Sequence, residues 1–294
     1  MTEIRKVGVV GGGLMGHGIA QITAQAGCSV VLREVDEQHI SKTRGKIDRS
    51  LSKIVEKGNL TEDDAEAIKQ RIQSTTDYKD LADCELVIEA ITEDINRKLE
   101  MWREVDAIAA DKAYFATNTS SLSVIAQASA TSRPDRFFGL HFFNPPQAMK
   151  LVEVIRCLTT SDDTLQTGID FAKSLKKLAV VTKDQTGFIV NRLLVPYLLD
   201  AICAYGEGVG SIPEIDTAMK AGLGHPMGPL TLADFVGLDT MSAICDEMFQ
   251  EFRERRFAQP PLLRKLVTAG WYGRKSGMGF YDYSGDSPIV NPNL

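Results

Sequence analysis

The stretch Val7-Gly8-Val9-Val10-Gly11-Gly12-Gly13-Leu14-Met15-Gly16 decides how this chain begins to fold. Its first four residues are apolar or glycine and predict a short buried strand, which runs directly into a glycine-rich turn. Beyond the turn, Ile19, Ile22 and Thr23 share one face at helical spacing. The stretch therefore predicts a strand, a tight turn and a helix that packs back on the strand.

Gly11, Gly13 and Gly16 fit the pattern G-x-G-x-x-G in the strand-to-helix context that this pattern requires. The first glycine allows a tight turn, the second a close approach of the backbone to a pyrophosphate, and the third close packing of the helix on the strand. The amino end of the helix then faces the phosphates. A turn that is merely tight is the alternative. We predict a dinucleotide site that includes Gly11, Gly12, Gly13, Leu14, Met15 and Gly16.

An acidic residue stands at the end of the next predicted strand. Glu34 closes Ser29–Glu34, 18 residues after Gly16, where a carboxylate can accept hydrogen bonds from ribose hydroxyls and repel a 2′-phosphate. This favours NAD over NADP as the dinucleotide. Arg33 and Asp36 leave NADP open as the dinucleotide, because an arginine near this position can also accommodate a 2′-phosphate.

The composition is that of an ordinary globular protein. Of 294 residues, 44% are hydrophobic and 24% are charged, and no apolar run approaches the roughly 18 residues that a membrane helix needs. The net charge of −6 argues against a nucleic-acid-binding protein, although a local basic surface could still bind a phosphorylated small molecule. We expect neither a membrane nor a nucleic acid as a partner.

The five cysteines are scattered and form no Cys-x-x-Cys pair. This pattern predicts neither a disulfide framework nor a metal site and is typical of a reducing compartment. The first residues, Met1–Lys6, have neither the apolar run of a secretory signal nor an Arg- and Ser-rich leader. The cytoplasm is therefore the expected location.

Short β-rich apolar runs alternate with helical stretches up to about residue 183, which predicts a mostly parallel, Rossmann-type α/β sheet covered on both faces. The expected strands are Lys6–Gly11, Ser29–Glu34, Leu86–Ala90, Tyr114–Thr117, Phe137–Phe142, Leu151–Ile155 and Ala179–Thr182. From Phe188 onward, long apolar helical patterns replace them. We therefore predict a dinucleotide-binding domain over residues 1–184 and an all-helical C-terminal domain over residues 185–294.

Residues Glu37–Lys57 are predicted to form one helix with two distinct faces. The apolar face consists of Ile40, Ile47, Leu51 and Ile54. The other face is polar and basic, with Lys46, Ser50, Lys53 and Lys57, and with Lys42 and Arg49 alongside. A solvated charged face and a surface that binds the phosphates of a large acidic substrate both explain this pattern. The length of the helix, greater than a crossover needs, favours the functional interpretation.

Among the four histidines, His141 has the position expected of a reactive group. It stands near the end of the predicted strand Phe137–Phe142, and α/β folds bind ligands at the carboxyl ends of their strands. Twelve residues later, Glu153 interrupts the apolar strand Leu151–Ile155. A carboxylate buried among such neighbours needs a partner.

His141 is the partner that we expect for Glu153. A carboxylate on one imidazole nitrogen fixes the tautomer and leaves the other nitrogen free to act as a base. A dehydrogenase needs such a base to remove the proton of an alcohol while hydride leaves its carbon. An unrelated histidine and glutamate are the alternative. His17, His39 and His225 are expected to have surface, packing or turn roles.

Two further polar segments stand at places where chemistry is expected. Asn118-Thr119-Ser120-Ser121 follows the strand Tyr114–Thr117, where small hydroxyls and amides suit a substrate oxygen; a serine that caps the next helix is the other interpretation. Asn191 lies in an otherwise apolar helix at the predicted domain border. A buried amide there needs a polar partner.

These segments together resemble the 3-hydroxyacyl-CoA dehydrogenase family, including its short-chain 3-hydroxybutyryl-CoA members, over nearly the whole chain. The resemblance rests on Gly11–Gly16, Glu89–Glu93, Asn118–Leu122, His141–Pro145 with Leu151–Val154, Gly187–Arg192 and Gly224–Pro229. One departure is Glu34, where the family usually has Asp. This change lengthens the ribose-binding side chain but keeps its charge.

The resemblance implies roles for particular residues. His141 is similar to the family's general base and Glu153 to the carboxylate that orients it, while Ser120 and Asn191 match contacts of the substrate's 3-oxygen or neighbouring atoms. The residues that match NAD contacts, besides the glycine turn and Glu34, are Glu93, Lys98, Ser120, Asn144 and Lys275. Those that match coenzyme A contacts are Ser50 and Lys57.

The implied activity is the reversible, NAD-dependent oxidation of an (S)-3-hydroxyacyl-CoA. The resemblance also implies a homodimer formed through the C-terminal helices, although core packing explains the aliphatic residues of Phe188–Cys203 equally well. Two other functions stay open. One is a sugar-acid or carnitine-type hydroxy-acid dehydrogenase, which needs no coenzyme A surface. The other is a non-catalytic dinucleotide-binding protein, which would need neither His141 nor Glu153.

Overall fold

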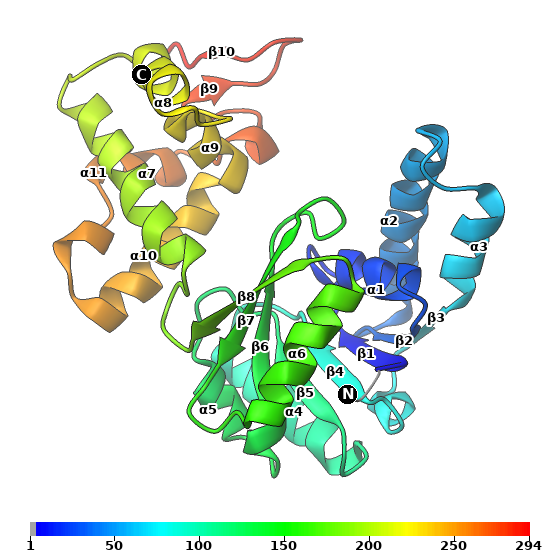
Figure 1. Cartoon of the computed structure of the whole chain (residues 1–294). Coiled ribbons are helices and arrows are strands. Elements are labelled where there is room, and N and C mark those ends of the chain that lie inside the picture. The colour runs from blue at the N-terminus through cyan, green and yellow to red at the C-terminus, as the bar shows by residue number, and fades with distance from the viewer. Residues whose placement is uncertain (1–3) are drawn as a thin grey trace. The chain divides into compact units, whose positions relative to one another are not determined.

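The computed structural model describes residues 4–294, which form two compact units that divide in sequence between Phe188 and Ile189 (Figure 1). The first unit is built on one eight-stranded sheet in the order β3-β2-β1-β4-β5-β6-β7-β8. Its strands are β1 (Lys6–Val10), β2 (Ser29–Arg33), β3 (Ile72–Thr75), β4 (Leu86–Glu89), β5 (Tyr114–Thr117), β6 (Phe137–Phe142), β7 (Leu151–Arg156) and β8 (Leu178–Lys183). All neighbouring pairs are parallel except β6 and β7, which confirms the predicted mostly parallel Rossmann-type sheet.

Strand β3 and the helix before it, α3 (Glu62–Gln70), were not predicted from the sequence. The four residues of β3, Ile-Gln-Ser-Thr, contain one apolar side chain, so they carry no strand pattern of their own. They are held in the sheet by parallel pairing with β2, in which Val30 lies opposite Ile72. This edge strand therefore forms because it pairs with β2, and not because of a pattern in its own sequence.

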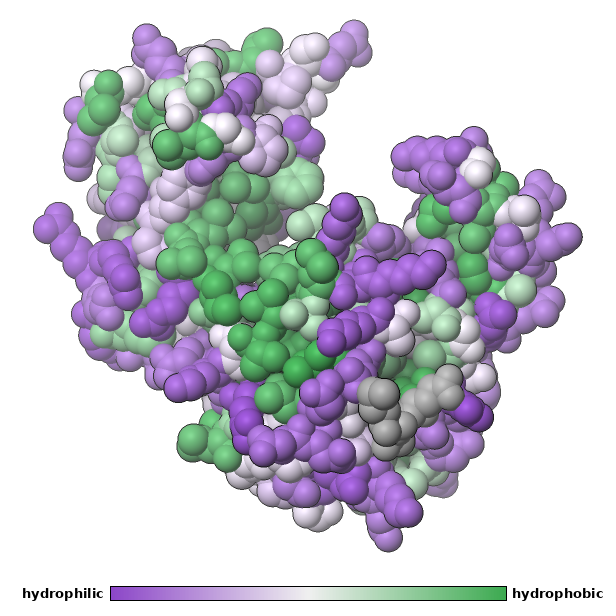
Figure 2. All heavy atoms as spheres, in the orientation of Figure 1, coloured by the Kyte–Doolittle hydropathy of each residue, from purple (hydrophilic) through white to green (hydrophobic). Residues whose placement is uncertain are grey.

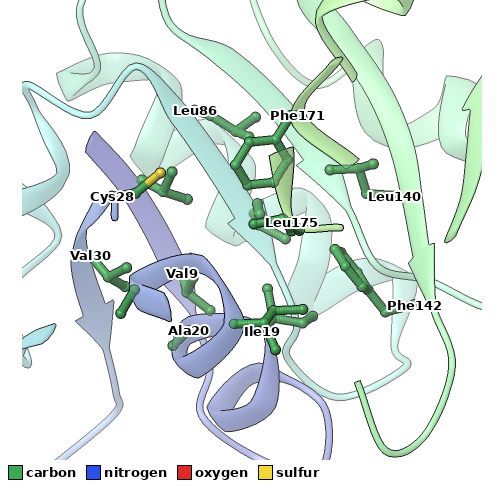
Figure 3. Packing of buried hydrophobic residues seen from close by; sticks show 14 of the residues in the cluster. Val9, Ile19, Ala20, Cys28, Val30, Leu86, Leu140, Phe142, Phe171 and Leu175 are labelled. Atoms are coloured by element: carbon green, nitrogen blue, oxygen red, sulfur yellow. The ribbon is translucent and has the colours of Figure 1, made fainter. Parts of the chain in front are cut away.

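Helices cover both faces of the sheet and bury a separate hydrophobic cluster on each. One cluster joins the sheet to α1 (Gly16–Gln25) and α6 (Asp162–Ser174). Figure 3 shows Ile19 and Ala20 of α1 in it, with Phe171 of α6 and Leu175, which follows that helix. The other lies under α4 (Ile95–Ile108) and α5 (Val124–Ala128), around the fully buried Trp102. The sheet is thus buried on both sides, as parallel sheets require.

Helix α2 spans Glu37–Glu56 and forms a hairpin with α3 that extends from the sheet (Figure 1). Ile40, Ile47 and Leu51 of its apolar face are buried, while Lys53 and Lys57 are exposed. Figure 2 shows a mostly hydrophilic hairpin surface with a hydrophobic strip between the two helices. The two faces predicted for this helix are therefore the buried and exposed faces of α2.

The glycine turn joins β1 to α1 with almost no space between them. Gly11 has φ +90°, a backbone conformation that residues other than glycine rarely adopt. A Cβ placed on Gly16 would lie 1.7 Å from the carbonyl oxygen of Gly11, whereas one on Gly13 would meet no atom within 4 Å. Gly16 therefore sets the closeness of helix and strand, and Gly13 faces open space.

We predict that Gly16→Ala lowers the melting temperature of the protein by about 6 °C or more in scanning calorimetry. The backbone atoms that a Cβ would strike cannot rotate away, so overpacking should cost about 2 to 3 kcal/mol. Gly13→Ala is the matched control and should change the melting temperature by less than about 2 °C. Equal melting temperatures for the two variants would show that α1 does not need this contact.

The second unit is helical, as predicted, apart from one short antiparallel strand pair. Its elements are α7 (Val190–Gly206), α8 (Ile212–Leu223), α9 (Pro229–Val236), α10 (Leu238–Phe252), α11 (Pro261–Thr268), β9 (Tyr281–Asp282) and β10 (Ile289–Val290). Each strand of the pair has two residues, too few to produce an alternating pattern in the sequence. The helices enclose a core that includes Leu198, Ile202 and Met248.

Two buried carboxylates tie the C-terminal segment to the helices of this unit. Asp234 accepts hydrogen bonds from the backbone N–H groups of Phe280 and Tyr281 and from the hydroxyl of Tyr283. Asp216 accepts from the hydroxyl of Tyr281. Burial raises the pKa of Asp234 to about 6. These hydrogen bonds hold the strand pair β9–β10 in place, in a region where few hydrophobic side chains are buried.

No helix within residues 4–294 is both long enough and apolar enough to cross a lipid bilayer.

Candidate active site

The antiparallel pairing of β6 with β7 places His141 directly opposite Glu153. The imidazole Nδ1 lies 2.7 Å from Glu153 Oε2, and both side chains are buried. Because the carboxylate accepts this hydrogen bond, Nδ1 carries the hydrogen and Nε2 is left with its lone pair. The pair therefore presents a base of fixed tautomer at the carboxyl end of a buried strand.

Two aromatic rings hold the imidazole in place. The ring centroid of Phe143 lies 4.5 Å from that of His141, and Phe188 lies at 5.5 Å. Both rings are tilted against the imidazole, so they restrict its rotation while Glu153 fixes its direction. Phe143 belongs to the segment His141–Pro145 and Phe188 to the segment Gly187–Arg192, but no signal in the sequence indicated that Phe188 packs on His141.

The segment Asn118–Ser121 lies at the carboxyl ends of β5 and β6. Asn118 Oδ1 accepts the backbone N–H of Phe142, at 2.9 Å, which ties the two strand ends together. Glu93 accepts from the backbone N–H of Ser120, at 2.9 Å, and from the hydroxyl of Thr119. Helix α5 is capped by Ser123. Ser120 is therefore not the residue that caps the helix, and Glu93 holds the backbone of Ser120 in place.

An ion cluster in which Glu89 and Lys98 are buried lies beside this segment. The ammonium of Lys98 is 2.8 Å and 2.9 Å from the two oxygens of Glu89 and 2.8 Å from Glu93 Oε2. Glu89 also accepts from the hydroxyl of Thr117 and from the backbone N–H of Ile91. One cation therefore lies between a carboxylate at the end of β4 and a second carboxylate in the loop that follows it.

Burial and charge act in opposite directions in this cluster. Burial raises the pKa of the Glu89 carboxyl, and the Lys98 ammonium offsets part of that effect. For Glu93, desolvation is outweighed by Lys98 and by its hydrogen-bond donors, so its pKa lies below the usual value. Glu89 was named within the segment Glu89–Glu93 but was assigned no role from the sequence; the available signal was an acid at the end of the apolar run Leu86-Val87-Ile88.

We predict that Lys98→Met lowers the melting temperature by about 10 °C at pH 8, because removal of one partner from a buried ion pair costs about 3 to 5 kcal/mol. Without the ammonium, burial keeps the folded-state pKa of Glu89 above its unfolded value, so stability falls as pH rises through it. The deficit should therefore be smaller at pH 5 than at pH 8 in scanning calorimetry. Lys98→Met/Glu89→Gln should recover part of the loss, and no recovery would mean that the charge is not the cause.

The predicted dinucleotide turn is closed on one side by Glu34. Its Oε1 accepts the backbone N–H of Gly12 at 2.9 Å and the hydroxyl of Thr43 at 2.8 Å. Lys46 Nζ and His17 Nδ1 both lie within hydrogen-bonding distance of the carbonyl oxygen of Gly13. A hollow beside the turn is lined by Gly12, Gly13, Glu34, His39, Ser41, Lys42, Thr43, Gly45, Lys46 and Arg49.

These residues fit a pyrophosphate and an adenosine ribose. The open space over Gly13 admits a close approach to the backbone, Leu14 is exposed beside it, and Met15 precedes the first residue of α1. The Arg33 guanidinium stacks on the ring of Tyr78, 3.8 Å from its centroid, and its Nε donates to Thr76. Arg33 is thus engaged elsewhere, which leaves Glu34 as the side chain at the end of β2 that borders the hollow.

The remaining sequence-predicted residues occupy three other places. Ser50 and Lys57 lie on α2, two turns apart, with Lys57 capping its carboxyl end. Asn144 is exposed shortly after β6. Asn191 and Lys275 belong to the second unit, where Asn191 is in the first turn of α7 and Lys275 pairs with Asp239 at 2.5 Å.

A Rossmann-type sheet with a glycine turn and a buried His–Glu pair at its carboxyl edge defines the class of nicotinamide-dependent dehydrogenases. Residues 6–185 match the 3-hydroxyacyl-CoA dehydrogenase, NAD binding domain, and residues 187–283 match the 3-hydroxyacyl-CoA dehydrogenase, C-terminal domain. The chain belongs to the 3-hydroxyacyl-CoA dehydrogenase family, and its first unit contains the family's NAD-binding domain.

Individual relatives agree with this assignment. The chain is 46% identical over 282 residues to the 3-hydroxybutyryl-CoA dehydrogenase of Mycobacterium tuberculosis, covering 95% of this chain and 99% of that one. It is 47% identical over 287 residues to the mitochondrial hydroxyacyl-coenzyme A dehydrogenase of Homo sapiens, covering 95% and 91%. The crystal structure of (S)-3-hydroxybutyryl-CoA dehydrogenase from Ralstonia eutropha is 43% identical, with a TM-score of 0.92 and coverage of 96% and 100%.

Proposed function

We propose that this enzyme interconverts a short-chain (S)-3-hydroxyacyl-CoA, such as (S)-3-hydroxybutyryl-CoA, and the corresponding 3-oxoacyl-CoA. The observation that carries the proposal is the buried hydrogen bond between His141 and Glu153 at the carboxyl edge of the sheet. The relatives named above support the substrate class. The family's NAD-binding domain supports the cofactor.

His141 acts as the general base in the direction of oxidation. Its Nε2 accepts the proton of the 3-hydroxyl while C3 loses a hydride and the C3–O bond becomes a carbonyl. Bound NAD supplies the acceptor for that hydride. Glu153 stabilises the imidazolium that forms, because its carboxylate already lies 2.7 Å from Nδ1. In the reverse direction the imidazolium returns the proton.

Two further side chains position the substrate oxygen. Ser120 is held by Glu93 next to the strand that carries His141, and its hydroxyl would donate to the 3-oxygen. Asn191, at the start of α7, would supply an amide to the same oxygen or a neighbouring atom. Such donors matter most in reduction, where negative charge develops on the carbonyl oxygen.

The NAD contacts that we propose extend from the glycine turn to the ion cluster. Gly11, Gly12, Gly13, Leu14, Met15 and Gly16 surround the pyrophosphate, and Glu34 accepts from the adenosine ribose. The contacts proposed nearer the reacting ring are Glu93, Lys98, Ser120, Asn144 and Lys275. We also propose a cytoplasmic homodimer formed through the second unit, where Leu193 and Leu223 are exposed.

We predict that His141→Ala lowers kcat for reduction of acetoacetyl-CoA by NADH about 10²- to 10⁴-fold, the usual contribution of a general acid–base group. Glu153→Gln should also lower kcat, because an amide can neither balance the imidazolium charge nor fix the tautomer. The Kd for NADH, measured by fluorescence titration, should change less than threefold in both variants. Wild-type kcat in either variant would contradict the proposed roles.

We predict that Lys57→Glu raises KM for acetoacetyl-CoA about tenfold, because the variant places a carboxylate where a phosphate would bind. Ser50→Ala should have a smaller effect in the same direction. Lys69→Glu on α3 is the control, since that lysine already pairs with Glu66 at 2.7 Å.

The discriminating substrate is acetoacetyl-pantetheine, which lacks the nucleotide phosphates of coenzyme A. Its KM should be the same in the wild type and in Lys57→Glu. If KM for acetoacetyl-CoA were unchanged in Lys57→Glu, the polar face of α2 would be a solvated surface, as the simpler interpretation of the sequence holds.

A further inference from the structure

The carboxylate of Glu34 is held in one position by two donors from different elements. The backbone N–H of Gly12 and the hydroxyl of Thr43 both donate to Oε1, at 2.9 Å and 2.8 Å. Thr43 is a buried residue of α2, and its hydroxyl also lies 3.1 Å from the carbonyl oxygen of Gly12. Thr43 thus connects α2 to both the glycine turn and the end of β2.

The three groups leave no space between them. A Cβ placed on Gly12 would lie 2.4 Å from Cγ2 of Thr43 and 2.7 Å from Oε1 of Glu34. Glu34 itself is 6% exposed, so its side chain has little room to adopt another rotamer while Thr43 holds it. The extra methylene of a glutamate, compared with an aspartate, is accommodated by this packing.

The second oxygen of Glu34 is left for a ligand. Oε2 accepts no hydrogen bond from any group within residues 4–294, and Glu34 and Thr43 both line the hollow beside the glycine turn. A ribose with free 2′- and 3′-hydroxyls can donate to such an oxygen, whereas a 2′-phosphate would be repelled by it.

The cations that line the same hollow act against this preference for a ribose without a 2′-phosphate. Lys42, Lys46 and Arg49 line it, and by themselves they would attract a 2′-phosphate. The preference therefore depends on whether the negative charge of Glu34 stays at the end of β2. A glutamate that rotated toward the cations would pair with them and leave the ribose position open to a phosphate.

We propose that Thr43 is a positioning residue that fixes Glu34 in its ribose-binding conformation and thereby sets the preference for NAD over NADP. The proposal rests on the ribose contact that we propose for Glu34. It assigns to α2 a second role besides the proposed contact with coenzyme A, since Thr43 is on its buried side.

The test is the ratio of the Kd values for NADH and NADPH, measured by fluorescence titration of the intact protein without acyl-CoA. In Thr43→Val the hydroxyl is replaced by a methyl group of similar size, and we expect the preference for NADH to fall about tenfold, since one hydrogen bond to a charged group is lost. Thr43→Ser keeps the hydroxyl and should stay within about twofold of the wild type. Thr167→Val removes a buried hydroxyl of α6 that donates to Asp163 and should leave the ratio unchanged.

A double-mutant cycle with Glu34→Ala separates this proposal from the one on which it rests. If Glu34→Ala alone leaves the NADH preference unchanged, the ribose contact of Glu34 is wrong. If Glu34→Ala lowers the preference and Thr43→Val does not, Glu34 binds ribose without help from Thr43 and the present proposal is overturned. The expected result is a fall in both single variants and no further fall when Thr43→Val is added to Glu34→Ala.

A general loss of structure would not imitate this result. It would weaken NADH and NADPH alike and leave their ratio unchanged, which would count against the proposal. Should Thr43→Val fail to fold, Thr43→Ala supplies the same comparison with a smaller side chain.

Discussion

The contact between Gly16 and the carbonyl oxygen of Gly11 brings α1 against β1, and the cofactor side of the first unit depends on it. Because no side chain separates helix and strand, the amino end of α1 lies at the carboxyl edge of the sheet. The same closeness exposes the backbone of Gly13 and places Gly12 where its N–H meets Glu34. The dinucleotide site that we propose is thus built mainly from backbone, with one carboxylate, that of Glu34, proposed to select the ribose.

The hydrogen bond between His141 and Glu153 depends on a different constraint. It requires the antiparallel pair of β6 and β7 in a sheet whose other pairs are parallel. If β7 ran parallel to β6, Glu153 would have a different neighbour, because pairing register decides which side chains meet. The observed register puts His141 opposite Glu153 and leaves the imidazole a lone pair at Nε2. The site therefore needs no loop to bring base and carboxylate together, and Phe143 and Phe188 restrict the ring further.

Between these two sites lies the ion cluster of Glu89, Lys98 and Glu93. A buried ammonium with two carboxylates is expensive to assemble unless every group is paired, and here each charge has charged or hydrogen-bonding partners from at least two segments. The cluster links the ends of β4 and β5 to the loop that carries Ser120. We infer that it keeps the spacing between cofactor and substrate positions constant.

The sequence by itself determined the glycine turn and the order of the elements other than α3, β3 and the short C-terminal strand pair, and it predicted that His141 and Glu153 are partners. These features are local: G-x-G-x-x-G acts through backbone sterics, and an acid within an apolar strand such as Leu151–Ile155 signals a partner wherever the strand lies. Only the tertiary structure decided that β3 exists, that Glu89 shares Lys98 with Glu93, and that Thr43 holds Glu34. Each of these depends on segments distant in sequence that pair or pack together, and a single sequence carries no periodicity that reports which segments those are.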